Sequence, residues 1–211
     1  MIEVNLVSLK RSEMKPIKIL LGKAQINSAL KVISKRISAD FYGNYPLFIG
    51  VLNAAYPFMT DLGREIRIAH DVDFIRVKSF EEGIKRGNSL QMISCAQAAR
   101  VRDRNVIIVD TILDTGASMK FAIESLQRMS PASIHSCVLI DRKTRETMAD
   151  KDRPTPDYHG LVYHGTDYLV GYGLDYNGFF RSLNFITTMK EYQRKVGAVD
   201  SFIEGRGGVI L

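Results

Sequence analysis

The stretch with the clearest chemical character is residues 105–119, NVIIVDTILDTGASM, where two acids and four small residues follow an apolar run. Asp110 ends the run, Asp114 comes four residues later, and Thr-Gly-Ala-Ser then leads into a helical pattern. Backbone N–H groups at a helix start, with the hydroxyls of Thr115 and Ser118, can cradle a phosphate monoester. The two carboxylates beside that anion need hydroxyls, a metal or a proton-bearing group as neighbours. This order of residues is typical of a site for a sugar phosphate.

The same spacing also has a purely structural interpretation. Asp114 can simply cap the helix that begins near Thr115, because aspartate is a favoured capping residue. Spacing alone does not separate a capping aspartate from one that contacts a substrate.

Five short apolar runs are predicted to be the strands that position this segment. They are LFIGVL (residues 47–52), VDFIRV (72–77), NVIIVD (105–110), IHSCVLI (134–140) and YLVGY (168–172). Most lack polar alternation, which indicates strands covered on both faces, as in a parallel sheet.

Helical patterns lie between these strands. Apolar residues from Ile26 to Phe41 recur at spacings of three and four, and Gly43 follows as a stop signal. Further helices are predicted over residues 54–66 and along the stripe from Met119 to Met129. Alternating strands and helices predict an α/β fold in which ligands sit at the carboxyl ends of the strands.

Two longer segments do not fit the predicted core. Residues 79–94 mix glycine, serine and charge, and we interpret them as a mobile active-site loop. Residues 142–156 are polar and bounded by proline, and we interpret them as an excursion toward a lid or hood. Both can also be plain solvated loops.

Composition sets broad limits on the function. The chain has 211 residues, of which 45% are hydrophobic and 25% charged, as in an ordinary globular protein. Its net charge of +6 favours anionic partners without choosing among them. Two cysteines, no spanning apolar run and no signal peptide lead us to expect a soluble, cytoplasmic protein. The four histidines and two cysteines show no metal-ligand spacing.

Residues 105–119 resemble the ribose 5-phosphate signature of type I phosphoribosyltransferases, and four further stretches resemble hypoxanthine-guanine phosphoribosyltransferases in the same order. These are PLFIGVLNAAYPFMTDLGREI (residues 46–66), VDFIRVKSF (72–80), PASIHSCVLIDRK (131–143) and YLVGYGLDYNGFFRSLNFI (168–186). VGYGLDYNGFFRSL is the part most specific to purine salvage. The resemblance covers about residues 20–189.

The resemblance implies a type I phosphoribosyltransferase fold, with a parallel sheet flanked by helices and a small hood. It implies an N-terminal extension over residues 1–19 that joins the hood, and a domain over 20–189 with a catalytic loop at about 79–94 and a hood at about 142–189. Residues 190–211 form a tail that packs on a neighbouring subunit or is disordered. A homodimer or homotetramer is expected.

The implied activity is Mg²⁺-dependent transfer of ribose 5-phosphate from phosphoribosyl pyrophosphate (PRPP) to N9 of a 6-oxopurine. The candidate bases are hypoxanthine and guanine, with xanthine as a further candidate. Asp114 matches the aspartate near purine N7 that handles the departing proton. The implied ribose and phosphate site consists of Asp110, Thr111, Asp114, Thr115, Gly116, Ala117 and Ser118. The implied pyrophosphate site consists of Leu52, Asn53, Ala54 and Arg181.

The implied purine site consists of Arg142, Tyr168, Leu169 and Asp175. Tyr168 stands where the family stacks an aromatic ring on the base, and Arg142 stands where a lysine donates to O6. Lys143 takes that role if the match slips by one residue. Asp175, through water, and Asp110 are the implied Mg²⁺ ligands.

The chain departs from the family pattern at several positions. Thr111 replaces the second of two paired acids, and Arg142 replaces a lysine with a donor of different geometry. Asn53 stands where the pyrophosphate loop usually has lysine or glycine, and Ala54 and Ala55 stand where it usually has a pair of glycines. Alanine is costlier than glycine in a strained backbone. These changes point to altered affinity or metal dependence.

Three alternatives remain open at this stage. The enzyme could act on another base, or be a weakly active homologue. A protein of a different class, a regulator that senses PRPP and binds nucleic acid, is suggested by the basic runs Lys35-Arg36 and RVRDR (residues 100–104). Nucleic acid is not the favoured partner, because no nucleic-acid-binding motif is visible.

Overall fold

A six-stranded sheet forms the centre of the molecule, which the computed structural model describes over residues 18–82, 85–94 and 96–191. Its strands are β1 (Leu47–Leu52), β2 (Asp71–Glu82), β3 (Lys85–Ser94), β4 (Asn105–Leu113), β5 (Ser133–Arg142) and β6 (Tyr158–Tyr163). They lie in the order β3-β2-β1-β4-β5-β6, and every neighbouring pair is parallel except β2 and β3. The predicted α/β fold with a parallel sheet is confirmed.

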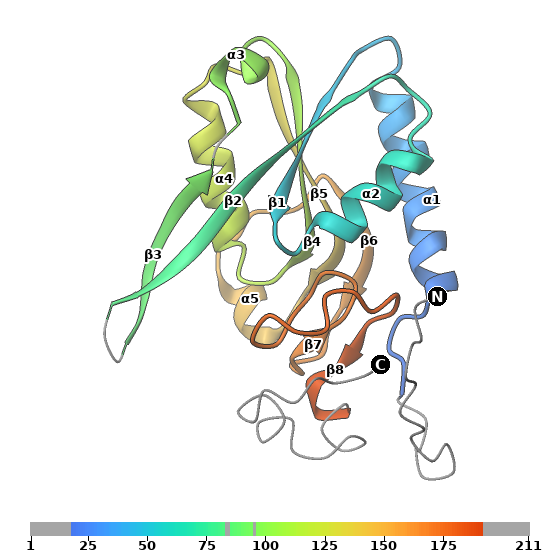
Figure 1. Cartoon of the computed structure of the whole chain (residues 1–211), viewed down its shortest axis with the longest axis vertical. Coiled ribbons are helices and arrows are strands. Elements are labelled where there is room, and N and C mark those ends of the chain that lie inside the picture. The colour runs from blue at the N-terminus through green and yellow to red at the C-terminus, as the bar shows by residue number, and fades with distance from the viewer. Residues whose placement is uncertain (1–17, 83–84, 95, 192–211) are drawn as a thin grey trace, which may run out of the picture.

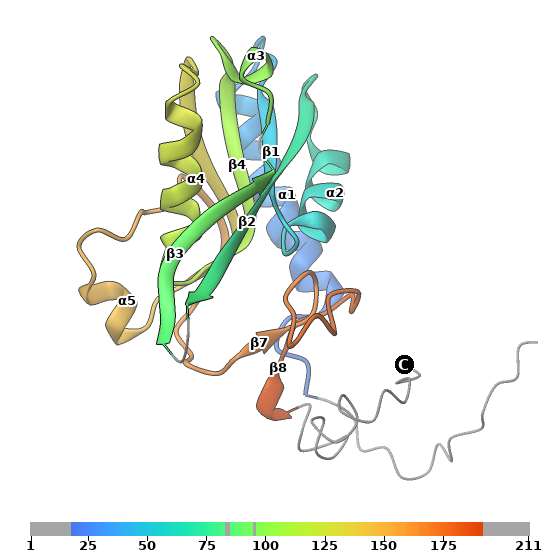
Figure 2. The same ribbon diagram turned by 60° about the vertical axis from the view of Figure 1, so that its left-hand side comes forward.

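Helices cover both faces of this sheet (Figures 1 and 2). They are α1 (Lys23–Asp40), α2 (Tyr56–Glu65), α3 (Ala98–Val101), α4 (Ala117–Gln127) and α5 (Arg145–Ala149). Ile107 and Val109 of β4 pack in the core layer that includes α1 and α2. Val106 and Ile108 pack in the opposite layer, against α4. Successive strand residues point to opposite faces, so a strand with two covered faces is apolar throughout, as its sequence indicated.

The apolar stripe of α1 is buried as predicted. Ile26, Leu30, Ile33 and Ile37 are each at most 2% exposed. The helix ends at Asp40, and Gly43 adopts a left-handed conformation with φ of 76°. A glycine at such a position reverses the chain without the steric cost that a side chain would bring.

A second, two-stranded sheet lies at the carboxyl ends of the parallel strands (Figure 1). It pairs β7 (Leu169–Val170) with β8 (Thr187–Thr188), antiparallel. Leu21 bridges to Ile186, so the start of the described chain joins this small unit. Residues 1–17 and 192–211, which include most of the predicted N-terminal extension and tail, lie outside the described residues.

The prediction of a sheet strand over residues 168–172 was wrong in extent and place. Only Leu169 and Val170 are extended, and they belong to the second sheet. Gly171, Tyr172 and Gly173 all have positive φ, which ends the strand. The edge strand of the main sheet is instead β6. Its sequence, YHGLVY, contains a glycine, which interrupts the hydrophobic pattern by which strands are predicted.

Within residues 79–94, predicted to be a loop, residues 79–82 form the end of β2 and residues 85–94 form the antiparallel β3. The backbone pairing of two polar strands, rather than an apolar pattern, produces this hairpin. Its predicted role as a mobile catalytic loop stays a prediction. Within residues 142–156, α5 begins at a capping box in which the Thr144 hydroxyl accepts a hydrogen bond from the Thr147 N–H. No helix in the described part of the chain is long and apolar enough to span a membrane.

Candidate functional site

The loop between β4 and α4 forms the first part of the site. Gly116 caps α4 in a left-handed conformation, with φ of 84°. A hollow of about 190 Å³ lies over this loop, and its lining includes Asp110, Asp114, Thr115, Gly116, Ala117 and Ser118. The first N–H groups of a helix have no partner within it and carry partial positive charge. The loop is therefore suited to an anion of phosphate size.

Asp110 projects from β4 into the same hollow. Its Oδ1 accepts a hydrogen bond from the Thr111 N–H at 2.7 Å. Burial raises the pKa of Asp110 from 3.8 to about 7, although that N–H and the charge of Arg181 oppose the shift. Asp110 can therefore carry a proton at near-neutral pH and donate to a hydroxyl or accept from one.

Replacing Asp110 by asparagine is expected to remove a pH dependence of stability. The folded-state pKa is above the ordinary value, so the folded protein binds this proton more tightly than the unfolded one. The stabilisation is complete below pH 3.8 and is lost as the pH rises through about 7. In Asp110→Asn this loss should be absent, so its Tm should fall less steeply than that of the wild type as the pH rises.

The measurement is Tm of both proteins in buffers from about pH 4 to about pH 8. Asp103→Asn, at an exposed aspartate, is the matched control and should follow the wild-type curve. Identical curves for Asp110→Asn and the wild type would contradict the raised pKa.

A second hollow, of about 160 Å³, adjoins the first. Both are lined by Ala54, Ile112 and Asp114. The second is also lined by Arg142, Tyr168, Leu169, Leu174, Asp175 and Arg181. β4, β5 and the small unit around β7 thus bring residues distant in sequence to one place. Asp114 borders both hollows.

Arg142 is fixed so that it faces Asp114. Its Nε donates to the Gly165 carbonyl at 3.1 Å, and its Nη2 donates to the Asp167 carbonyl at 3.0 Å. The remaining arm, Nη1, lies 3.2 Å from Asp114 Oδ2. The Arg142 side chain is 12% exposed and that of Asp114 is 49% exposed. The guanidinium is therefore held rigidly, while the carboxylate stays accessible to a ligand.

Asp175 and Arg181 form an ion pair in the lining of the second hollow. Arg181 Nη2 lies 2.7 Å from Asp175 Oδ1, and Nη1 donates to the Gly173 carbonyl at 2.6 Å. The Gly178 N–H donates to Asp175 Oδ2. Tyr168, more than half exposed, donates its hydroxyl to the Asp175 carbonyl at 2.9 Å. The Tyr168 ring is thereby fixed beside the hollow.

The loop after β1 is held from two directions. It contains a cis peptide bond between Leu52 and Asn53. The Thr111 hydroxyl donates to the Ala54 carbonyl at 2.8 Å. Gly173, with φ of 95°, lies so close to that carbonyl that a Cβ there would collide with it. The loop is therefore braced by β4 on one side and by the small unit on the other.

Most of the predicted site residues are brought together by this arrangement. Thr111 is an exception, because its side chain is fully buried and turned toward the loop after β1 rather than into either hollow. Leu52 and Asn53 adjoin the site without lining either hollow. Lys143 pairs with the buried Asp141 at 3.4 Å and lines neither hollow, so of these two neighbouring basic residues only Arg142 borders the site.

Sequence reasoning missed three residues that shape the site. Gly173 directly follows the predicted strand over residues 168–172, and Asp141 directly follows the one over residues 134–140. Arg153 lies in the segment predicted only as an excursion, and its guanidinium reaches the carbonyls of Leu113 and Asp114. Its polar surroundings in the sequence gave no signal of burial.

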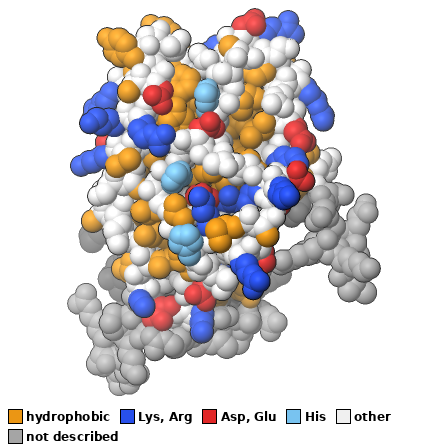
Figure 3. Space-filling model, turned by 180° about the vertical axis from the view of Figure 1, so that it is seen from behind, with side chains coloured by type: hydrophobic (Ala, Val, Ile, Leu, Met, Phe, Trp, Pro, Cys, Tyr) orange, Lys and Arg blue, Asp and Glu red, His pale blue; other side chains and the backbone are white. Residues whose placement is uncertain are grey.

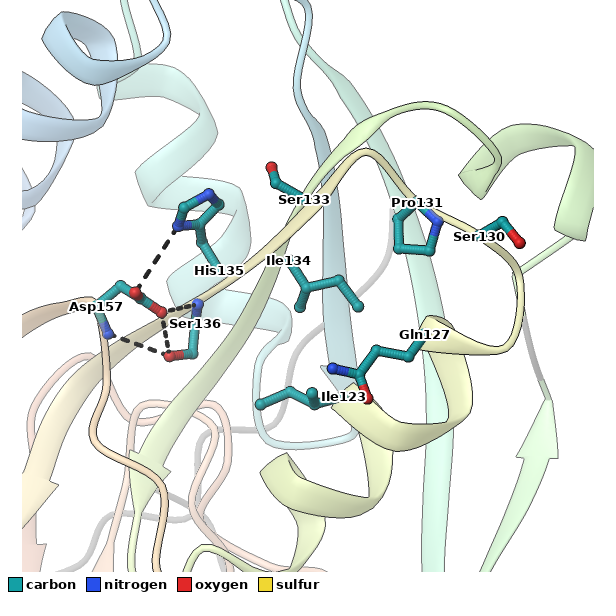
Figure 4. Close-up of a pocket in the computed structure, with 9 residues that line it drawn as sticks. All are labelled: Ile123, Gln127, Ser130, Pro131, Ser133, Ile134, His135, Ser136 and Asp157. Atoms are coloured by element: carbon teal, nitrogen blue, oxygen red, sulfur yellow. Dashed lines mark hydrogen bonds and ion pairs between the residues drawn. The ribbon is translucent and has the colours of Figure 1, made fainter.

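Another hollow lies at the amino-terminal end of β5, and it contains none of the predicted site residues (Figure 4). Asp157 accepts hydrogen bonds there from the N–H and the hydroxyl of Ser136, at 2.7 and 2.8 Å. His135 lies 3.7 Å from the other carboxylate oxygen. Ser136 is 3% exposed, so its hydroxyl is not presented to a substrate. These contacts join the start of β6 to β5 and are structural.

Three arginines of the basic runs make contacts within the fold. Arg100 pairs with Asp73 at 2.8 Å, and both Arg100 and Arg104 lie 3.5 Å from Asp71. Arg36 lies over the Tyr158 ring, 5.2 Å from its centroid. Seen from behind, basic and acidic side chains are interspersed (Figure 3). The nucleic-acid interpretation gains no support from these residues. Among the described residues, no group of three or more His, Cys, Asp or Glu could hold a metal.

Comparison with known proteins identifies the fold and its family. The family of the phosphoribosyl transferase domain matches residues 19–156. A hypoxanthine-guanine phosphoribosyltransferase of Lactococcus lactis is 28% identical over 173 residues, which are 82% of this chain and 91% of the relative. A bifunctional protein TilS/HprT of Listeria innocua is 29% identical, and the matched region spans 26% of its length.

The fold also matches a solved structure. The crystal structure of a hypoxanthine phosphoribosyltransferase from Staphylococcus aureus superposes with a TM-score of 0.74 and 26% identity. The match covers 92% of this chain and 99% of that one. The predicted fold, a flanked parallel sheet with a small additional unit, is therefore confirmed at the level of this fold family.

Proposed function

Because the chain belongs to the phosphoribosyl transferase domain family, we propose that it transfers ribose 5-phosphate from PRPP to N9 of a 6-oxopurine. In this reaction the bond from C1′ to the pyrophosphate oxygen breaks and the bond from N9 to C1′ forms. The purine loses one proton, and pyrophosphate leaves. The products are the nucleoside monophosphate, IMP or GMP, and pyrophosphate.

The observation that carries the proposal is the meeting of the two hollows at Asp114. An anion-binding loop lies on one side of this carboxylate, and a pocket with an aromatic ring and an arginine lies on the other. This arrangement suits a substrate with a phosphate at one end and a planar base at the other. The alternative in which Asp114 only caps the helix is wrong, because Gly116 is the N-cap of α4 and no side chain caps it. The Asp114 carboxylate instead faces Arg142 at 3.2 Å.

In the proposed mechanism the 5′-phosphate accepts hydrogen bonds from the backbone of residues 115–118, at the start of α4. Asp110 contacts the ribose hydroxyls. Asp114 accepts the proton from purine N7 as N9 attacks C1′. Its negative charge also stabilises the positive charge that develops at C1′. Arg142 donates to O6 and limits the pose of the base.

The leaving group is proposed to lie between the loop of residues 52–54 and Arg181. Backbone amides of the braced loop and the guanidinium supply the donors that a diphosphate needs. Asp175 and Asp110 have the hard oxygen donors that Mg²⁺ prefers, and they border the two hollows. When bound, Mg²⁺ would neutralise charge on the diphosphate. The donor set therefore fits this ion.

Arg142→Met is expected to raise KM for the base by about 10- to 100-fold, the loss of one charged hydrogen bond. KM for PRPP should change by less than about threefold, because the phosphate loop is untouched. Steady-state kinetics with each substrate varied in turn measures both values. Lys143→Met is the matched control, and a larger base defect in it than in Arg142→Met would move the role to Lys143.

The function is tested by product analysis with hypoxanthine, guanine and xanthine side by side, with PRPP and Mg²⁺. Formation of the corresponding monophosphate supports the proposal. Folded protein that binds PRPP yet converts none of the three bases would instead favour a homologue that senses PRPP. The relative kcat/KM values rank the bases, since a group-specific hydrogen bond separates substrates strongly.

A further inference from the structure

We propose that Arg153 is a positioning residue that fixes the shape of the phosphate loop. It acts from the segment after α5, which passes over the carboxyl ends of β4 and β5. The inference rests on the proposed function, in which that loop holds the 5′-phosphate of PRPP. The contacts themselves are independent of which base is used.

The guanidinium of Arg153 joins the ends of two parallel strands. Its Nε donates to the Asp114 carbonyl at 2.7 Å, and its Nη2 lies 2.9 Å from the Leu113 carbonyl. The same nitrogen lies 3.1 Å from the Arg142 carbonyl. Leu113 and Asp141 are register partners of β4 and β5. Arg153 therefore bridges the point at which the two strands diverge.

A buried carboxylate provides the counter-charge. Arg153 Nη2 lies 2.6 Å from Asp141 Oδ1, and the two side chains are 8% and 1% exposed. Asp141 Oδ2 has no hydrogen-bond partner and lies 3.4 Å from Lys143 Nζ. Removing one partner of a buried ion pair leaves the charge of the other partner buried without a counter-charge, which is strongly unfavourable. The pair therefore keeps Arg153 in one orientation.

The next residue holds the other end of the loop. Pro154 packs on Gly116, where an added Cβ would lie 2.6 Å from the Pro154 Cδ. Arg153 thus contacts the carbonyls at the start of the loop, and Pro154 covers the glycine at its end. The proposed donors to phosphate are the backbone N–H groups of residues 115–118, which follow the Arg153 contact and include Gly116. Their direction depends on both contacts.

The geometry requires a guanidinium rather than only a positive charge. Three carbonyls and one carboxylate oxygen lie around two nitrogens of one planar group. An ammonium is a single point with three donors, and it cannot span the same positions. Arg153→Lys therefore keeps the charge and loses the bridge, whereas Arg153→Leu loses both.

The first test is hydrogen exchange of the free protein. In Arg153→Leu and Arg153→Lys, amide exchange in residues 113–119 is expected to be about tenfold faster, with exchange in β1 unchanged. Lys151→Leu removes a charge from an exposed position two residues away and should match the wild type. Unchanged exchange in 113–119, or an equal rise in β1, would overturn the inference.

The second test separates binding from turnover. In Arg153→Lys, KM for PRPP is expected to rise by about tenfold while kcat stays within about threefold, because binding uses the loop and the proton acceptor is retained. An equal fall in kcat with unchanged KM would overturn the positioning role. If the wild type converts no base, the exchange measurement still decides this inference, so its failure is distinguishable from failure of the proposed function.

Discussion

Asp114→Asn is expected to lower kcat by about 10²- to 10⁴-fold, the usual range for loss of a general base. PRPP affinity should change by less than about threefold, because the backbone of residues 115–118 is unaltered. Arg142 should remain in place, since the Gly165 and Asp167 carbonyls also hold it. The measurements are kcat with the best base and calorimetric titration with PRPP and Mg²⁺.

Asp103→Asn is the matched control for this substitution. Asp103 is exposed, has φ of 57°, and asparagine tolerates that conformation well. The control should retain wild-type kcat. Wild-type turnover in Asp114→Asn would remove this carboxylate from the mechanism and leave it only as the ion-pair partner of Arg142.

Gly173→Ala is expected to raise KM for PRPP by at least about tenfold and to lower Tm. A Cβ at this position collides with the Ala54 carbonyl, which the Thr111 hydroxyl also holds. Either the loop after β1 moves or the small unit does, and both contribute to the proposed pyrophosphate site. Displacements of about 1 Å at such positions are costly for binding and rate.

Gly43→Ala separates this collision from backbone strain. Gly43 also has positive φ, 76°, but nothing lies within 4 Å of its Cβ position. It should therefore lose only about 1 kcal/mol of unfolding free energy, with KM unchanged. Thermal unfolding and PRPP kinetics on both variants provide the comparison. A KM in Gly173→Ala equal to that of Gly43→Ala would show that the brace on Ala54 does not matter.

The sequence predicted the fold best in elements whose buried side chains recur with the period of a helix or a strand. β1 was predicted with its observed bounds, and the buried stripe of α1 was predicted residue by residue. Both are core elements in which burial imposes the pattern. β6 was missed because its sequence contains a glycine. β7 was placed in the wrong sheet and made too long, because the three positive φ values that end it depend on tertiary contacts.

The candidate site was only partly predictable for the same reason. The order Asp-x-x-x-Asp-Thr-Gly indicated an anion loop, since local backbone geometry determines it. Thr111 was expected in the ribose and phosphate site, at the place of a missing acid, whereas its hydroxyl donates to the Ala54 carbonyl, 57 positions away in sequence. Arg153 gave no signal at all, because its burial depends on how the segment after α5 crosses two strand ends.

The ion pair between Asp175 and Arg181 has a consequence for how a polyanion enters. In the proposed function, an incoming diphosphate would compete with the Asp175 carboxylate for the Arg181 guanidinium. The carboxylate released in this exchange becomes available to a cation that arrives with the diphosphate. Binding and release of the diphosphate would then each exchange one ion-pair partner of Arg181 for another.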